Sequence, residues 1–387
     1  MLESFANFLQ NTGLYALISS GGIDAVKTII MIAIACVLLY LAIVKKFEPL
    51  LLLPIAFGML LSNLPMIKDS SAIMMHTEFF TNPEYMTDGK YINVGYICQH
   101  GGLLDLLYLG VKLGIYPPLI FVGIGCMTDF GPLIANPKSI LLGAAAQFGV
   151  FFTFVGALVL SALVPSINFG IKEAASIGII GGADGPTAIY VTKSLAPALL
   201  PAIAVAAYSY MALIPVIQPP IMKLMTRKKD RMIVMEQLRP VSKTEKILFP
   251  IIVTIIVALI IPDAVSLVGC LMLGNLMKES GVVERLTKMA QNELMNIITL
   301  FLGVTVGATA TASSFLSAQT IGIIVLGLIA FCFSTVGGLF LGDIMCWVTK
   351  GKVNPLIGSA GVSAVPMAAR VSQTVGQKEN PSNFLLM

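Results

Sequence analysis

Long apolar runs of the length that crosses a bilayer recur along this chain. Ala25–Val44, Ile140–Leu163 and Leu195–Val216 are three of them, and a spanning helix needs roughly 20 consecutive apolar residues. Only 11% of the 387 residues are charged, whereas soluble domains carry roughly 25%. A β-barrel would show short alternating segments instead of such runs. The sequence therefore predicts an all-α polytopic membrane protein with about ten to twelve membrane segments, several of them short.

The apolar run between Lys172 and Lys193 is interrupted at its centre by Gly181-Gly182-Ala183-Asp184-Gly185-Pro186-Thr187. Gly and Pro weaken helices, and a carboxylate at mid-membrane depth is expensive. We therefore expect a helix that is broken inside the membrane, so that Asp184 and freed backbone carbonyls face an ion. Low dielectric favours the neutral carboxyl and a bound cation favours the carboxylate, so one Asp can trade a proton for Na⁺. The alternative is a structural Asp that caps a helix start.

A second breaker-rich stretch, Lys350–Arg370, lies in the other half of the chain. Asn354, Ser359 and Ser363 offer neutral oxygens, which bind hard cations together with a carboxylate. Arg370 ends the stretch and is a bidentate partner for a substrate carboxylate. The alternatives are tight helix packing at the serines and a snorkelling arginine at the membrane surface.

The two halves of the chain share a weak sequence similarity. Asp129, Asn136-Pro137 and the small residues Gly143–Ala146 resemble Asp343, Asn354-Pro355 and Gly358–Gly361. Paired broken segments of this kind are typical of transporters built from inverted repeats, with the binding site between the repeats. Chance resemblance between small-residue helices is the alternative. The expected organisation is a first membrane half (1–222) with a polar extracytoplasmic loop (66–100), a basic loop (223–246) and a second membrane half (247–387).

The distribution of charge predicts how the chain is oriented in the membrane, and the placement of Cys and His argues against a metal site built from them. Eight of the 24 Lys and Arg residues fall in the basic loop against three acids, so the positive-inside rule makes this loop cytoplasmic. The six cysteines show no ligand spacing, and both histidines lie in the polar loop, so no Cys or His metal site is predicted. No nucleic-acid partner is expected; the surroundings are membrane lipid.

Several apolar segments are shorter than a full span. Pro49–Pro65 has the length of a half-span, and Leu103–Leu113 and Pro117–Met127 are each too short to cross alone. In the second half, Ile321–Phe333 and Val336–Val348 are predicted as separate apolar segments. Short segments of this kind are consistent with more broken helices.

The motifs around these breaks resemble a known family. Gly178–Ile189, reading GIIGGADGPTAI, and Asn354–Pro366, reading NPLIGSAGVSAVP, followed by Arg370, closely resemble the β subunit of the biotin-dependent sodium-pumping decarboxylases. That family includes oxaloacetate, glutaconyl-CoA, methylmalonyl-CoA and malonate decarboxylase pumps. The resemblance covers nearly the whole chain.

The resemblance implies a division of labour. A cytoplasmic α carboxyltransferase subunit moves a carboxyl group onto biotin, which a carrier subunit or domain holds. The β subunit decarboxylates carboxybiotin, takes up a proton and exports Na⁺. It is expected to form a β homotrimer with small γ subunits in a bacterial inner membrane. The acyl substrate is chosen by another subunit.

The resemblance also implies roles for single residues. Catalytic roles fall to Asp184, Tyr210 and Arg370, and carboxybiotin is expected at Arg370 and Asn354. The Na⁺ ligands expected from the resemblance are Asp184, Asn354 and Ser363, and we add Thr187 and the backbone of Gly358 as further oxygen donors. The family continues past an Asn-Phe-Leu-Leu-Met stretch into another broken apolar segment, so a further segment is expected beyond Met387.

The predicted function is therefore a membrane subunit that couples carboxybiotin decarboxylation to Na⁺ export with uptake of a proton. The alternative is a secondary Na⁺- or H⁺-coupled carboxylate carrier with no chemistry of its own, because the same broken helices and Arg370 would serve it. A plain membrane anchor would need neither a buried carboxylate nor two broken helices.

Overall fold

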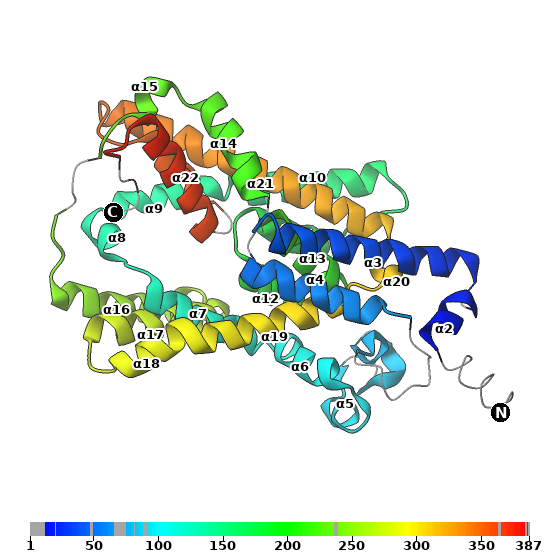
Figure 1. Cartoon of the computed structure of the whole chain (residues 1–387). Coiled ribbons are helices and arrows are strands. Elements are labelled where there is room, and N and C mark those ends of the chain that lie inside the picture. The colour runs from blue at the N-terminus through cyan, green and yellow to red at the C-terminus, as the bar shows by residue number, and fades with distance from the viewer. Residues whose placement is uncertain are drawn as a thin grey trace, which may run out of the picture.

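The computed structural model describes residues 12–19, 21–46, 49–65, 75–80, 82–87, 91–211, 213–235, 239–362, 365–383 and 385. These residues are almost entirely helical (Figure 1). The α-helices up to the basic loop are α2 (Gly13–Ser19), α3 (Gly22–Ile43), α4 (Pro49–Asn63), α5 (Val94–His100), α6 (Leu103–Lys112), α7 (Tyr116–Met127), α8 (Gly131–Ala135), α9 (Ile140–Ala146), α10 (Phe148–Leu163), α11 (Ile171–Gly178), α12 (Gly185–Leu195), α13 (Leu200–Met211) and α14 (Ile214–Met225).

The remaining helices follow in the basic loop and the second half. They are α15 (Lys228–Arg231), α16 (Lys243–Ile260), α17 (Val265–Ser280), α18 (Glu284–Met289), α19 (Met295–Ala308), α20 (Ala312–Phe315), α21 (Ala318–Val348) and α22 (Val365–Glu379). The 3₁₀ helices are η1 (Thr77–Phe80), η2 (Pro83–Tyr85), η3 (Pro137–Ser139), η4 (Ile179–Gly181), η5 (Pro197–Leu199), η6 (Pro262–Ala264) and η8 (Pro355–Ser359), and η7 (Ala290–Leu294) is a π-helix. The strands β1 (Met86–Thr87) and β2 (Tyr91–Ile92) form one antiparallel pair.

Three described helical stretches are long and apolar enough to cross a membrane: Gly22–Ile43, Pro137–Leu163 and Ala318–Val348. The first two match runs that the sequence singled out. The third joins two predicted segments into one 31-residue helix, α21. Its centre, at Ser334 and Thr335, stays helical, and the Thr335 hydroxyl donates to the carbonyl of Phe331 over 2.9 Å, a bond that helical Ser and Thr often form. The expected ten to twelve segments and the inverted repeats stay predictions.

Two further apolar stretches are broken in the structure. The helices α6 and α7 together pass the same test for a membrane span but are bent by 69° at their junction. Gly114 adopts φ +76° there, a conformation that suits glycine, and Pro117 lies in the first turn of α7. Each half is too short to cross alone, as the sequence predicted. Over the predicted span Leu195–Val216 the structure has α13 (Leu200–Met211) and the start of α14 (Ile214–Met225).

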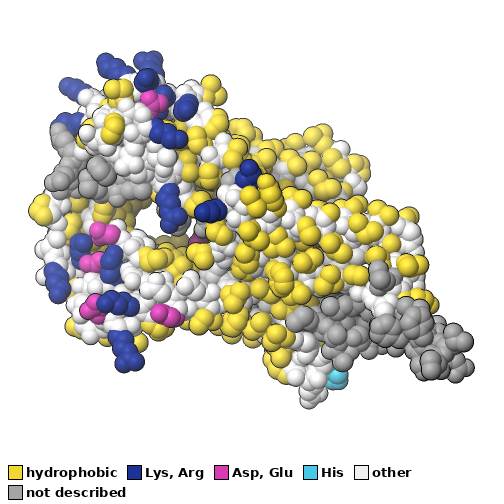
Figure 2. All heavy atoms as spheres, viewed as in Figure 1, with side chains coloured by type: hydrophobic (Ala, Val, Ile, Leu, Met, Phe, Trp, Pro, Cys, Tyr) yellow, Lys and Arg dark blue, Asp and Glu magenta, His cyan; other side chains and the backbone are white. Residues whose placement is uncertain are grey.

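At one end of the molecule, two groups of helices spread apart (Figure 1). The α21 group consists of α9, α10, α14, α21, η8 and α22, and the α17 group consists of α7, α16, α17 and α18; helices within each group pack together. Figure 2 shows this face of the molecule hollowed between the two groups. Charged side chains gather at the same end, and hydrophobic side chains dominate the rest of the face. A surface of that kind is typical of a protein embedded in lipid.

Helix α12 connects the two groups. It starts next to η4, which packs on α10 and α21, and it also contacts α7. Near the end of α12, the Lys193 ammonium group lies close to Gly114 at the junction of α6 and α7. A Cβ added to Gly114 would be 2.6 Å from the Lys193 nitrogen. The Tyr190 hydroxyl lies 2.7 Å from the Ser266 hydroxyl at the start of α17. The segment that carries Asp184 therefore begins on one group and ends on the other.

The described part of the polar loop 66–100 folds onto the start of α6. The buried carboxylate of Asp105 accepts hydrogen bonds from the backbone N–H groups of His76 (2.8 Å) and Gly102 (2.9 Å) and pairs with the His76 ring over 2.6 Å. The His76 ring also stacks on Phe79 at 4.6 Å. Asp105 therefore fixes this loop over one end of the broken α6–α7 pair.

Candidate functional site

The helix that the sequence predicted to be broken at Asp184 is broken there. Helix α11 ends at Gly178, the single turn η4 follows, and α12 begins at Gly185. Asp184 is the N-cap of α12, and its Oδ1 accepts hydrogen bonds from the Thr187 backbone N–H (3.2 Å) and the Thr187 hydroxyl (2.5 Å). No hydrogen bond or ion pair occupies Oδ2 among the described residues. Asp184 therefore caps a helix and also keeps one oxygen open to a ligand.

The local sequence explains this geometry. Pro186 stands in the first turn of α12, where its missing N–H costs no hydrogen bond. A side chain on Gly181 would come within 3.0 Å of Ala330 on α21 and of the Gly149 backbone on α10. Because these distances are shorter than ordinary van der Waals contacts, glycine lets the break lie closer to both helices than a residue with a side chain would.

Neighbouring side chains bind the backbone carbonyls that the break frees. The Ser334 hydroxyl on α21 donates to the carbonyl of Gly181. The Gln147 side chain, between α9 and α10, donates to the carbonyl of Gly182 over 3.2 Å. A helix break inside a membrane protein needs such partners, since unpaired backbone groups cost several kcal/mol in an apolar medium, about 2–7 kcal/mol each.

The second predicted break is also present. After α21 the chain forms η8 and resumes as α22 at Val365. Asn354 is fully buried; it donates to the carbonyls of Arg231 and Ile233, both at 2.9 Å, and accepts from the Leu356 N–H over 3.1 Å. Its side chain thus anchors the residues that follow α15. A Cβ on Gly358 would overlap the carbonyl oxygen of Gly338, so η8 and α21 touch backbone to backbone.

Helix α21 brings the two breaks together. Gly181 lies beside Ser334, whereas Gly358 lies beside Gly338, one turn further along. One turn of four residues advances about 6 Å along a helix. The similar small-residue stretches Gly143–Ala146 and Gly358–Gly361 also lie close together, because a Cβ on Gly361 would lie 3.8 Å from the Cα of Gly143. Their local structures differ elsewhere: Asp343 lies within α21, whereas Asp129 lies between α7 and α8.

For the other predicted site residues, the structure gives fewer side-chain contacts. Tyr210 belongs to α13, beside α12 and α21, but the description does not extend to its side chain. Ser363 lies outside the described residues. Arg370 is exposed on α22 and pairs with no carboxylate of the described residues. Its guanidinium is therefore available to an anion.

A buried polar cluster beside the second break escaped the sequence analysis. The Gln218 side chain of α14 donates to the carbonyl of Ser359 over 2.9 Å, and the Ser359 and Ser372 hydroxyls lie 2.9 Å apart. All three residues are fully buried. The available signal was a glutamine between Pro215 and Pro219 in an apolar helix, since buried polar groups need partners. Ser334 could not be singled out from the sequence, because its hydrogen bond to the carbonyl of Gly181 depends on the fold.

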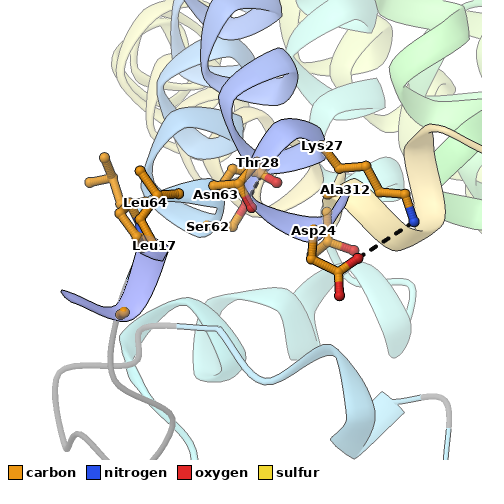
Figure 3. A pocket seen from close by; sticks show the side chains of 11 residues that line it. Leu17, Asp24, Lys27, Thr28, Ser62, Asn63, Leu64 and Ala312 are labelled. Carbon is orange, nitrogen blue, oxygen red and sulfur yellow. Dashed lines mark hydrogen bonds and ion pairs between the residues drawn. The ribbon is translucent and has the colours of Figure 1, made fainter. Parts of the chain in front are cut away.

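A cavity of about 400 Å³ lies between α3 and α4 at the end where α20 lies (Figure 3). Figure 3 shows the Asp24 carboxylate in an ion pair with Lys27, at 3.6 Å. Asn63 donates to the carbonyls of Met59 (2.8 Å) and Ala310 (2.7 Å) and so ties α4 to the end of α19. Because its carboxylate already has a counter-ion, this cavity is a poorer cation site than the break at Asp184.

The fold and the site define a class of protein: a helical membrane protein with a carboxylate, Asp184, at a helix break that packs on a long membrane-capable helix. Residues 27–387 match the family described as Na⁺-transporting oxaloacetate decarboxylase beta subunit. The chain belongs to this family, and it is a membrane subunit of a Na⁺-transporting decarboxylase. The predicted resemblance is confirmed.

Curated relatives support the same assignment. The chain is 57% identical over 387 residues to the methylmalonyl-CoA decarboxylase subunit beta of Propionigenium modestum, covering 100% of this chain and 94% of the relative. It is 55% identical over 358 residues to the glutaconyl-CoA decarboxylase subunit beta of Acidaminococcus fermentans, covering 92% and 86%. It is 50% identical over 415 residues to the probable oxaloacetate decarboxylase beta chain of Vibrio cholerae, covering 100% and 94%. These names do not favour a plain carrier.

Proposed function

We propose that this subunit decarboxylates carboxybiotin presented by a partner and that Asp184 is the group at which Na⁺ and a proton exchange. The observation that carries the proposal is the free Oδ2 of Asp184 at a helix break. Carboxylate, hydroxyl and carbonyl oxygens are the ligands that hard cations prefer. The reaction balances as follows: the N–COO⁻ group of carboxybiotin takes up one proton and yields N–H and CO₂.

The proposed Na⁺ site combines both breaks. Asp184 and Thr187 supply oxygens from the first, and Asn354, Ser363 and the backbone of Gly358 supply them from the second. The amide oxygen of Asn354 accepts one described hydrogen bond, and an amide oxygen has a second lone pair for a ligand. The contact of both breaks with neighbouring turns of α21 supports this combination.

The proposed coupling follows from electrostatics. Na⁺ enters from the cytoplasm and neutralises Asp184, while Arg370 and Asn354 orient the carboxylate of carboxybiotin. Loss of CO₂ leaves biotin in need of a proton, which passes from the outside through the site with Tyr210 as relay. Protonation of Asp184 removes the charge that held Na⁺, so the ion leaves outward.

The proposed setting follows the sequence predictions. The membrane is the bacterial inner membrane, residues 223–246 are cytoplasmic, and residues 1–222 and 247–387 form the two membrane halves. Partners are an α carboxyltransferase, a biotin carrier subunit or domain and a small γ subunit, with three β subunits in the complex. The acyl substrate differs among the relatives, which is consistent with its selection by another subunit.

Avidin distinguishes this function from a plain carrier. We expect avidin to stop Na⁺ uptake by proteoliposomes that contain the whole complex, because it sequesters the biotin that drives the pump. Avidin already saturated with free biotin is the control and should have no effect. Na⁺ uptake that continues at full rate with avidin would instead support the carrier.

Thr187 provides a graded test of the cation site. We expect Thr187→Val to raise the Na⁺ concentration for half-maximal transport about tenfold, since a hydrogen bond to a charged group contributes about 1.5–3 kcal/mol. The hydroxyl donates to Asp184 Oδ1, so its loss favours the protonated carboxyl, and the shift should grow as the pH falls. The measurement is substrate-driven uptake of radioactive Na⁺ over a range of Na⁺ concentrations.

Thr192 on the same helix is the matched control. Thr192 is fully buried, and its hydroxyl has no hydrogen-bond partner among the described residues. Thr192→Val should leave the Na⁺ dependence unchanged, because Val has nearly the same shape and no bond is lost. Equal shifts in the two variants would mean that the Thr187 hydroxyl has no special role.

A further inference from the structure

A cavity of about 780 Å³ lies where α21 ends beside the short helix α15, and none of the residues proposed for the exchange site lines it. Figure 2 shows Lys and Arg side chains gathered at this corner of the molecule, over α15. Its lining includes Arg227, Lys229, Asp230, Asp343, Trp347 and Lys350. Its volume is in the range of sites that hold small molecules, roughly 300–1,000 Å³.

The cavity is lined by charged side chains of both signs. Arg227, Lys229 and Lys350 are the cations, and Asp230 and Asp343 are the carboxylates. None of these five side chains forms an ion pair with any residue that the structure describes. A ligand that carries both an anion and a cation would satisfy both sets.

The cavity opens next to an exposed, apolar helix surface. Phe340, Ile344 and Trp347 are spaced by four and three residues on α21, so they share one face, and they are 60%, 38% and 82% exposed. Trp347 is the only tryptophan of the chain and ends this face at the rim of the cavity. Tryptophan is enriched where a membrane helix meets the headgroup layer. The ligand is therefore amphiphilic: its charged part enters the cavity and its apolar part follows α21.

We propose that this cavity binds the headgroup of a zwitterionic phospholipid with a primary ammonium, of the phosphatidylethanolamine type. Arg227, Lys229 and Lys350 hold the phosphodiester, and Asp230 and Asp343 accept hydrogen bonds from the ammonium. An anionic headgroup without an ammonium would face both carboxylates unpaired. A choline headgroup has no N–H to donate. The exposed apolar face that leads to the cavity favours a lipid over a soluble partner. Basic segments at cytoplasmic helix ends commonly bind lipid headgroups.

The single tryptophan makes this proposal measurable. The full-length chain is reconstituted in nanodiscs of choline lipid that contain a small fraction of brominated ethanolamine, choline or glycerol phospholipid, and the bromines quench Trp347 fluorescence on contact. We expect about a tenfold higher apparent affinity for the ethanolamine lipid than for the choline lipid. Asp230→Asn should remove this preference. Lys228→Gln, at an exposed residue beside Lys229 that does not line the cavity, should preserve it.

Three results would overturn the proposal that this cavity binds an ethanolamine lipid. Equal quenching by ethanolamine and choline lipids overturns the proposal, and so does a preference for the glycerol lipid that Asp230→Asn leaves unchanged. Protection of Trp347 only by added soluble subunits of the complex would assign the cavity to a protein partner and also overturn it. Unchanged thermal unfolding of Asp230→Asn controls for misfolding. The test requires neither Na⁺ transport nor decarboxylation, so its outcome is independent of the exchange site at Asp184.

Discussion

Asp184→Asn abolishes Na⁺ transport, with an expected loss of at least about 100-fold in the initial rate. The substitution keeps an oxygen that can accept the Thr187 hydrogen bonds, so α12 retains its cap, since Asn and Asp are similarly good caps. It removes the negative charge and the ability to bind a proton. Because Asn can neither carry the charge nor take up the proton, it cannot alternate between the two states on which the exchange depends. The measurement is substrate-driven Na⁺ uptake by proteoliposomes that contain the whole complex.

The control is a carboxylate on the same interrupted helix. Glu173 lies in α11, one helix earlier, and forms no ion pair with a described residue. Glu173→Gln should keep at least half of the wild-type rate, since partly exposed charges contribute little, about 0–1 kcal/mol. Sustained Na⁺ uptake by Asp184→Asn would remove this residue from the transport mechanism.

Gly358→Ala lowers the stability of the protein by about 1–3 kcal/mol or more, as overpacking of a tight interface does. The added Cβ would overlap the carbonyl oxygen of Gly338, and backbone atoms of a long helix cannot move aside as a flexible side chain can. The second break would then separate from α21. The measurement is the thermal unfolding midpoint of the purified protein in detergent.

Gly143 is the matched glycine for this comparison. It also lies in a small-residue stretch, but a Cβ added there meets nothing within 4 Å. Gly143→Ala should be neutral or stabilising by about 0.5–1 kcal/mol, because alanine favours the helix α9 in which Gly143 lies. Equal midpoints for both alanine variants would show that α21 and η8 do not touch as closely as this structure has them.

Sequence reasoning located the breaks because their causes are local. The run Gly181–Thr187 concentrates Gly, Pro and Asp within seven residues, and Asn354-Pro355 starts a turn for equally local reasons. The sequence analysis divided α21 between Phe333 and Val336, and Gly337 and Gly338 stand directly after that division. In the structure they remain helical and provide space: Gly338 faces η8, and a Cβ on Gly337 would lie 2.8 Å from Phe148. Small residues such as glycine are enriched where membrane helices pack closely.

The partners of the site residues could not be predicted from the sequence. Asn354 binds carbonyls more than 100 positions away, and Ser334 reaches Gly181 only because α21 packs against the break. Such contacts depend on tertiary packing rather than on spacing along the chain. The sequence did predict the motif and the family, because GIIGGADGPTAI is long and specific.

The most direct test of the central claim is the Na⁺ dependence of decarboxylation of free carboxybiotin by the purified membrane subunits. Free carboxybiotin bypasses the carboxyltransferase, so the rate reports on the membrane part alone. We predict that the rate rises and saturates with Na⁺, that K⁺ does not replace Na⁺, and that Asp184→Asn removes the dependence. A rate that is the same without Na⁺, or the same in Asp184→Asn, would contradict the assignment of coupling to Asp184.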